Sequence, residues 1–138
     1  MKKTVFCIGV FDLFHVGHVR FFERARALGD NLIVGVVSDE AVRKQKGEGR
    51  PIINFNNRAE IVASLRYVDY VYECSAFDAT QAIRELIELH NENIKIFAKG
   101  EDQAHIFDTG LINLAVNTEI LHRTPDVSTS ELVRRLNG

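Results

Sequence analysis

The chain is poor in cysteine and has no tryptophan. Two of its 138 residues are cysteines, Cys7 and Cys74, and they lie far apart in apolar settings. A disulfide framework or a cysteine-based metal site needs more thiols at closer spacing. Both cysteines are therefore interpreted as reduced core residues of an intracellular protein.

Long apolar runs and an excess of basic charge are also missing. No run of 18 apolar residues occurs and no signal peptide opens the chain, so the sequence predicts a cytoplasmic protein that does not bind a membrane. The formal net charge of −2 lacks the basic excess of general nucleic-acid binders, so we expect no nucleic-acid partner. With 46% hydrophobic and 26% charged residues, the composition is that of a globular domain, and we expect a single stand-alone domain over residues 1–138.

Short β-branched runs alternate with helical patterns along the chain. Expected strands are residues 4–10, 31–37, 67–72, 94–98 and 119–121; expected helices are 18–28, 57–65, 80–90, a short element near 106–116, and 129–136. The strands are continuously apolar, which is typical of parallel strands covered on both faces. The pattern predicts a doubly wound, Rossmann-like α/β domain with a five-stranded parallel sheet and helices on both faces. Ligands of such sheets bind beyond the carboxyl ends of the strands.

The first expected strand leads into the first expected helix through residues 9–18, which we call the histidine turn. A helix N-terminus attracts anions through its unpaired N–H groups and partial positive charge. His15 and His18 add imidazole donors there, so the sequence predicts a phosphate site. Metal ligation by these histidines and Asp12 is disfavoured because no third His or Cys lies nearby. A nucleophilic triad is disfavoured because no Gly-x-Ser-x-Gly elbow occurs. For one histidine of the pair, the alternative is a core residue whose hydrogen bonds are all made within the protein.

Three other places carry basic or hydroxyl side chains. Residues 43–51 contain two glycines and a proline, which exclude regular structure and indicate a mobile loop. That loop is either a solvated connection or a lid whose Lys44, Lys46 and Arg50 close over polyphosphate. Further on, Ser128 and Glu131 have the spacing of a capping box, which predicts a well-capped helix and a second anion site.

Two separated motifs resemble the signatures of the cytidylyltransferase-like nucleotidyltransferases. The first is His-x-Gly-His after Phe-Asp in the histidine turn, and the second is Arg-Thr-x-x-x-Ser-Thr from Arg123 to Thr129. With similar positions between them, the resemblance covers nearly the whole chain. It is strongest to glycerol-3-phosphate, phosphoethanolamine and phosphocholine cytidylyltransferases.

The resemblance implies that CTP and a small phosphomonoester give a CDP-alcohol and pyrophosphate. It also implies Mg²⁺ on the CTP triphosphate and a homodimer, for which we expect a contact through residues 66–71. The roles that it implies fall into three groups: His15, His18, Lys46 and Lys44 are catalytic; Gly9, Val10, Phe11, Asp12, Gly17, Gly100, Asp102, Arg123, Thr124, Ser128 and Thr129 bind the nucleotide; and Asp39, Arg58 and Arg66 bind the acceptor. For Arg58 and Arg66, an ordinary surface cation is the alternative.

Two departures leave the substrate open. Residues 46–51 and 98–100 resemble the adenylyltransferases that build ADP-heptose from ATP and a sugar phosphate. The small glycerol-phosphate enzymes have Asp-Asp-Trp after the glycine equivalent to Gly100, whereas this chain has no tryptophan there. Cytosine is favoured over adenine by the similarities in residues 12–39 and 66–69. A nucleotide-binding regulatory module without turnover, or a fragment of a bifunctional enzyme, is a further alternative.

Overall fold

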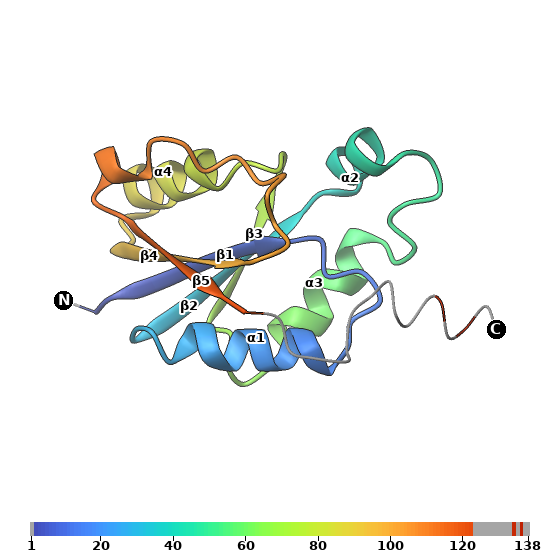
Figure 1. Cartoon of the computed structure of the whole chain (residues 1–138), viewed down its shortest axis with the longest axis horizontal. Coiled ribbons are helices and arrows are strands. Elements are labelled where there is room, and N and C mark those ends of the chain that lie inside the picture. Colours follow the sequence, from blue (N-terminus) through green and yellow to red (C-terminus); the bar gives the residue numbers. More distant parts are fainter. Residues whose placement is uncertain (1, 123–133, 135, 137–138) are drawn as a thin grey trace.

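The computed structural model describes residues 2–122, 134 and 136, and the described part contains a parallel sheet of five strands. The strands are β1 (Thr4–Gly9), β2 (Asn31–Val37), β3 (Tyr70–Cys74), β4 (Ile94–Gly100) and β5 (Asn117–Leu121). Their order is β3-β2-β1-β4-β5 (Figure 1). The doubly wound, Rossmann-like α/β fold predicted from the sequence is confirmed.

Helices cover both faces of the sheet. They are α1 (Val16–Arg26), α2 (Asp39–Lys46), α3 (Phe55–Ala63), α4 (Ala79–His90) and the 3₁₀ turn η1 (Leu111–Leu114). Helices α1 and α3 lie on one side of the strands and α4 on the other (Figure 1). Among the described residues, no helix is long and apolar enough to cross a bilayer.

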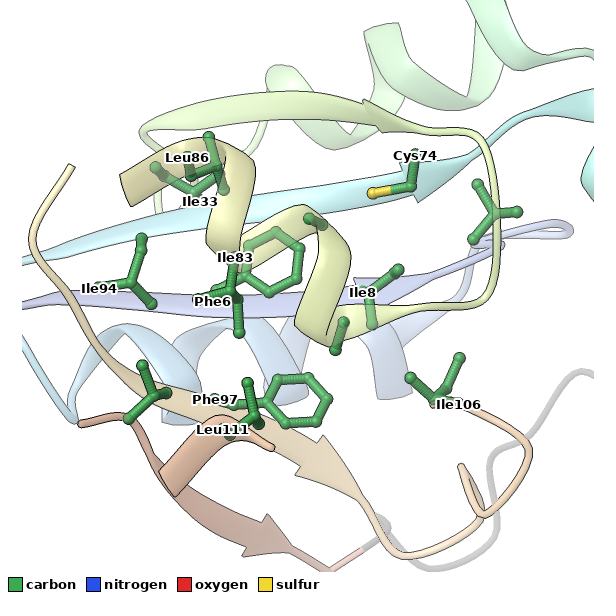
Figure 2. Packing of buried hydrophobic residues seen from close by; sticks show 14 of the residues in the cluster. Phe6, Ile8, Ile33, Cys74, Ile83, Leu86, Ile94, Phe97, Ile106 and Leu111 are labelled. Atoms are coloured by element: carbon green, nitrogen blue, oxygen red, sulfur yellow. The ribbon is translucent and has the colours of Figure 1, made fainter. Parts of the chain in front are cut away.

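The central strand β1 supplies side chains to both cores. Val5 and Cys7 point to the face covered by α1 and α3, and Phe6 and Ile8 point to the face covered by α4. Figure 2 shows Phe6 and Ile8 among the buried side chains of the core on the α4 face. All four are at most 1% exposed, which explains why the strand has no polar alternation in sequence.

Element ends differ from the predicted ones in two instructive places. Strand β3 begins at Tyr70 instead of 67 because residues 64–68 form a turn after α3, and the Asp69 N–H then bonds to the Leu32 carbonyl. The predicted short element near 106–116 contains only η1 as a helical turn. The predicted helix 129–136 falls almost entirely outside the described residues.

The basic segment 43–51 is not irregular throughout, so that prediction was partly wrong. Helix α2 continues to Lys46. Ser38 caps its first turn by accepting from the Ala41 N–H at 3.2 Å, and basic residues in its last turn complement the helix dipole. The helix ends at Gly47, whose φ of +93° is readily adopted by glycine. Lys44 and Lys46 therefore project from the last turn of a helix instead of from a loop.

Candidate active site

The histidine turn leaves the carboxyl end of β1 in a strained conformation. Phe11 and Leu13 have φ of +57° and +47°, in the left-handed region that non-glycine residues rarely adopt. The Phe11 ring packs against Phe22 of α1, with 5.0 Å between ring centroids. It also covers Gly9, where an added Cβ would lie 2.8 Å from a Phe11 ring carbon. A glycine is therefore needed at position 9 for the ring to lie there.

The two histidines form a reciprocal cap at the N-terminus of α1. His15 is the N-cap residue, and its Nδ1 accepts from the Gly17 N–H at 3.0 Å. His18 Nδ1 accepts from the His15 N–H at 3.1 Å, and the two rings stack with 4.0 Å between centroids. Because each Nδ1 accepts a backbone N–H, the proton of each neutral ring must sit on Nε2. The arrangement therefore fixes two Nε2–H groups as side-chain donors for a ligand.

Both imidazoles are neutral near pH 7. Burial lowers the pKa of His18 to about 4, with the neighbouring His15 contributing in the same direction. Burial also lowers the pKa of His15. The two neutral rings thus lie beside a helix N-terminus, each with its proton on Nε2. The described residues contain no group of three or more His, Cys, Asp or Glu side chains that would hold a metal ion.

The buried Asp12 carboxylate ties a second segment to the histidine turn. Its side chain is 2% exposed, and its two oxygens accept from the N–H groups of Ile52 at 2.7 Å and Ile53 at 2.9 Å. Arg50 Nε lies 3.5 Å from the same carboxylate. Residues 50–53 are therefore held against the turn by one buried carboxylate.

Arg58 is neither a surface cation nor placed for acceptor binding, and this corrects the sequence prediction. It is 0% exposed, and its guanidinium donates to the carbonyls of Ile53 and Val10 and to Asp39 Oδ1 at 2.8, 2.7 and 2.6 Å. Asp39 Oδ2 also accepts from the Phe55 N–H. Burial alone would raise the pKa of Asp39, but the bonds from Arg58 and Phe55 hold that pKa below its ordinary value. Arg58, which is fully buried, and Asp39, whose side chain is 33% exposed, together form an ion pair behind the turn.

Arg66 lies at the wrong end of the sheet for the predicted acceptor site. It precedes Tyr70, the first residue of β3, whereas the histidine turn follows the last residue of the parallel strand β1. Its guanidinium donates to the Tyr67 hydroxyl, which in turn donates to Glu23. Arg66 would also precede the strand expected at 67–72, so the direction of β3 in the parallel sheet, and not its exact start, places Arg66 away from the histidine turn.

Charged side chains face each other beyond the carboxyl ends of β1 and β4. Lys46 ends α2, and Lys99 near the end of β4 pairs with Asp108 at 2.8 Å. Burial lowers the pKa of His105, the charges of Lys46 and Lys99 lower it further, and Asp102 opposes them. The charges of Lys46, Lys99 and Asp102 therefore all act on His105, which places the end of α2 and residues 101–109 close to one another. His105 was not predicted, because nothing in the local sequence sets it apart.

Gly100 and its neighbours join the ends of two central strands. The Gly100 N–H donates to Gln103 Oε1, and Gln103 Nε2 donates to the Ile8 carbonyl at 2.7 Å. A Cβ on Gly100 would meet Asp102 Oδ1 at 3.0 Å, so the backbone here passes close to that carboxylate. Gln103 is a second residue that sequence reasoning missed, since its role depends on a carbonyl 95 positions away.

The structure therefore gathers most of the predicted nucleotide residues at one edge of the sheet. The predicted residues of the histidine turn lie at the end of β1, and Gly100 and Asp102 lie at the end of the adjacent β4. Lys44 projects from α2 but is 78% exposed and pairs with Glu40 at 3.3 Å. The predicted residues of the second motif, Arg123, Thr124, Ser128 and Thr129, lie outside the described part of the chain.

A cavity of about 220 Å³ lies beside this edge, between the end of β3 and α4. Its lining includes Ser38 at the end of β2, Tyr72, and the carboxylates of Glu73, Asp78 and Glu85. The Tyr72 hydroxyl donates to Glu85 at 2.7 Å, which raises the pKa of Tyr72 to about 12. The cavity is thus acidic and neighbours the site instead of containing the histidines.

Comparison with known proteins shows the family of the chain. The model of the family described as "Cytidylyltransferase-like" matches residues 6–135. The ethanolamine-phosphate cytidylyltransferase of Dictyostelium discoideum is 38% identical over 97% of this chain and 38% of its own length. The bifunctional protein HldE of Aliarcobacter butzleri is 57% identical over 51% of this chain and 15% of its own. This chain thus spans well under half the length of either relative.

A solved structure shares the fold at similar length. It is that of the lipopolysaccharide core biosynthesis protein from Thermoplasma volcanium, with a TM-score of 0.66 and 26% identity. The match covers 90% of this chain and 98% of the other. The histidine turn, the strand order and the family match over residues 6–135 lead to one conclusion: the chain belongs to the cytidylyltransferase-like family.

Proposed function

We propose that the protein transfers CMP from CTP to a small phosphomonoester and releases pyrophosphate. An oxygen of the phosphomonoester forms a bond to the α-phosphorus, and the bond from that phosphorus to the bridging oxygen of the β-phosphate breaks. The observation that carries the proposal is the histidine cap, in which both Nδ1 atoms are occupied and both Nε2–H groups are available to phosphate oxygens. His15 and His18 donate to the α- and β-phosphate oxygens as charge builds up on them.

The reaction needs no general base. The second pKa of a phosphomonoester is about 6, so the attacking oxygen is already ionised at pH 7. The barrier instead comes from bringing two anions together and from orienting them in line. Lys46, helped by Lys44, supplies positive charge from α2, opposite the histidine turn.

The nucleotide is expected to enter as its magnesium complex. Mg²⁺ keeps several waters and binds phosphate oxygens readily, so it needs few protein ligands. The donor set fits that mode: Asp12, the one carboxylate within the turn, already accepts two backbone N–H groups, and the described residues form no metal-binding cluster. When bound, the ion neutralises charge on the triphosphate.

The remaining contacts are proposed from the family motifs. Arg123, Gly100 and Asp102 line the base and ribose pocket, while Thr124, Ser128 and Thr129 contact the β- and γ-phosphates. A homodimer through residues 66–71 also stays part of the proposal. A monomer mass by light scattering at micromolar concentration would contradict the dimer without touching the proposed reaction.

Phosphoethanolamine is the acceptor that we favour. One relative that matches along 97% of the chain, at 38% identity, is named for ethanolamine phosphate; an HldE protein matches along 98% at 36% identity. The cavity beside the site is lined by Glu73, Asp78 and Glu85, and its negative charge suits an ammonium group better than the neutral hydroxyls of glycerol.

The second candidate is adenylyl transfer from ATP to a heptose phosphate. Its support is the 57% identity over 70 residues to the HldE protein, which is higher locally than the identity to the cytidylyltransferase. The histidines and the backbone of the turn would serve either nucleotide equally, so the choice depends on the base and acceptor pockets. A regulatory module without turnover is the third candidate.

The deciding experiment measures pyrophosphate release from CTP or ATP against glycerol 3-phosphate, phosphoethanolamine, phosphocholine and heptose phosphate. Release with CTP and phosphoethanolamine above all other pairs supports the proposal in full. Release with ATP and heptose phosphate replaces it by the second candidate. A folded protein that binds nucleotide but releases no pyrophosphate with any pair would favour the regulatory module.

A further inference from the structure

The strained backbone of the histidine turn needs something to hold it. Two non-glycine residues with positive φ, Phe11 and Leu13, flank Asp12 immediately before the N-cap His15. Such conformations persist only where the surrounding contacts fix them. The contacts that do so here come from residues 39–58, far along the chain.

Arg58 connects three separate elements through one buried guanidinium. Its Nη1 donates to the carbonyl of Val10 at the start of the turn, its Nε to the carbonyl of Ile53, and its Nη2 to Asp39 at the first residue of α2. The group is 0% exposed, so these bonds replace its water shell entirely. The turn, the segment before α3 and the helix that carries Lys46 are therefore joined at one point.

Asp12 makes a matching connection in the opposite direction. It leaves the turn and accepts from the N–H groups of Ile52 and Ile53, so Ile53 bonds to Asp12 through its N–H and to Arg58 through its carbonyl. The turn is thus held by a backbone carbonyl at position 10 and a carboxylate at position 12. Movement of either would disturb the residues between Val10 and His15.

We infer that Arg58 is a positioning residue of the proposed transferase reaction. With Asp39 and Asp12 it fixes the histidine turn relative to α2, so that the Nε2–H donors and Lys46 act on the same phosphate group. The inference rests on the proposed function for its catalytic consequence, but not for the geometry. It differs from the acceptor-binding role expected from the sequence, because Arg58 acts through Val10 and Asp39 without touching substrate.

The test is Arg58→Lys, with Arg84→Lys on the exposed face of α4 as the matched control. A lysine keeps the charge but has one ammonium in place of the planar fork, so it cannot reach the Val10 and Ile53 carbonyls and Asp39 together. We expect kcat to fall about 10²-fold, the loss typical of a misplaced catalytic group, with the KM for nucleotide changed less than threefold. The control should keep wild-type kcat.

Thermal unfolding and active-site titration separate positioning from simple loss of folded protein. If Arg58→Lys is folded at the assay temperature and its kcat per folded molecule equals that of wild type, the inference is wrong. If that variant fails to fold, Asp39→Asn takes its place; this removes the charge partner but keeps acceptor oxygen for one bond. Wild-type kcat in folded Asp39→Asn would equally overturn the inference.

A readout without turnover distinguishes failure of this inference from failure of the proposed function. ¹⁵N NMR of the imidazoles should report neutral Nε2–H tautomers for His15 and His18 in wild type, and changed Nδ1 shifts in Arg58→Lys. If the shifts change in Arg58→Lys but the wild-type protein has no transferase activity, the geometric link is supported and the proposed function is refuted. Unchanged shifts together with unchanged kcat in the variant would refute the link and leave the function standing.

Discussion

Replacing His18 by asparagine should separate its two roles. Nδ1 of His18 caps the helix by accepting the His15 N–H, whereas Nε2–H is the proposed donor to phosphate. Asparagine places its Oδ1 where Nδ1 lies, one bond beyond Cγ, but has no atom at the position of Nε2. His18→Asn therefore keeps the cap and loses the donor, while His18→Ala loses both.

The two losses have different expected sizes. A missing oxyanion donor costs about 10²–10³-fold in kcat, or about 3–4 kcal/mol in the activation free energy. A missing N-terminal cap costs about 1 kcal/mol of the free energy of unfolding, which for a chain of this size lowers the Tm by about 4 °C. Both variants lose the stacking on His15 and on Phe14, so the stability difference between them isolates the cap.

Pyrophosphate release at saturating substrates and urea unfolding measure the two effects. We expect equal loss of kcat in both variants and about 1 kcal/mol more destabilisation in His18→Ala, with His90→Asn at the end of α4 as a control near wild type in both assays. More than a tenth of wild-type turnover in His18→Asn would refute the donor role. Equal stability of the two variants would refute the capping role.

Three further outcomes follow from the same geometry. Burial lowers the folded-state pKa of His18 from 6.5 to about 4, so between pH 4 and pH 6.5 the unfolded chain binds more protons than the folded protein. The free energy of unfolding should therefore fall as the pH drops from 6.5 to 4. Urea titrations should show a smaller fall in His18→Asn. Gly9→Ala puts a Cβ 2.8 Å from the Phe11 ring, so we expect about 1–3 kcal/mol of destabilisation in thermal unfolding, and a variant as stable as wild type would contradict the packing described. Lys46→Gln should lower kcat/KM for the acceptor about 10²-fold and Lys44→Gln less than tenfold, because Lys44 is paired with Glu40 whereas the charge of Lys46 acts on His105 at the edge of the site; the reverse order in steady-state kinetics would exchange their roles.

The fold was predictable because it depends on patterns local to each element. Five apolar runs separated by helical patterns allow few arrangements other than a doubly wound parallel sheet. The histidine turn was predictable for the same reason: its cap, its glycine and its imidazoles lie within ten consecutive residues. Errors arose at the limits of elements, as in α2, which continues to Lys46 and ends at Gly47 inside the segment expected to be irregular.

The roles of Arg58 and Arg66 were not predictable, because they depend on contacts between distant parts of the chain. Arg58 is buried against a carbonyl 48 positions earlier, and nothing in the sequence around it distinguishes it from an exposed helix arginine. Arg66 falls outside the site because it precedes β3, at the amino end of the parallel strands, whereas the histidine turn follows the carboxyl end of β1. The residue type indicated a positively charged side chain in both cases, but the topology decided whether that side chain lies at the site.

The division of charge within the site bears on how it would accelerate transfer. Fixed cations at the histidine turn would bind the triphosphate of the ground state as strongly as the transition state, and such uniform binding does not raise kcat. Neutral Nε2–H donors, fixed by the cap and kept neutral by burial, contribute most when charge grows on the oxygens they face. Positive charge comes instead from Lys46 on α2, which Arg58 and Asp39 hold relative to the turn. How accurately Arg58 and Asp39 position Lys46 relative to the histidine turn, more than the number of basic groups, should therefore limit the rate of transfer.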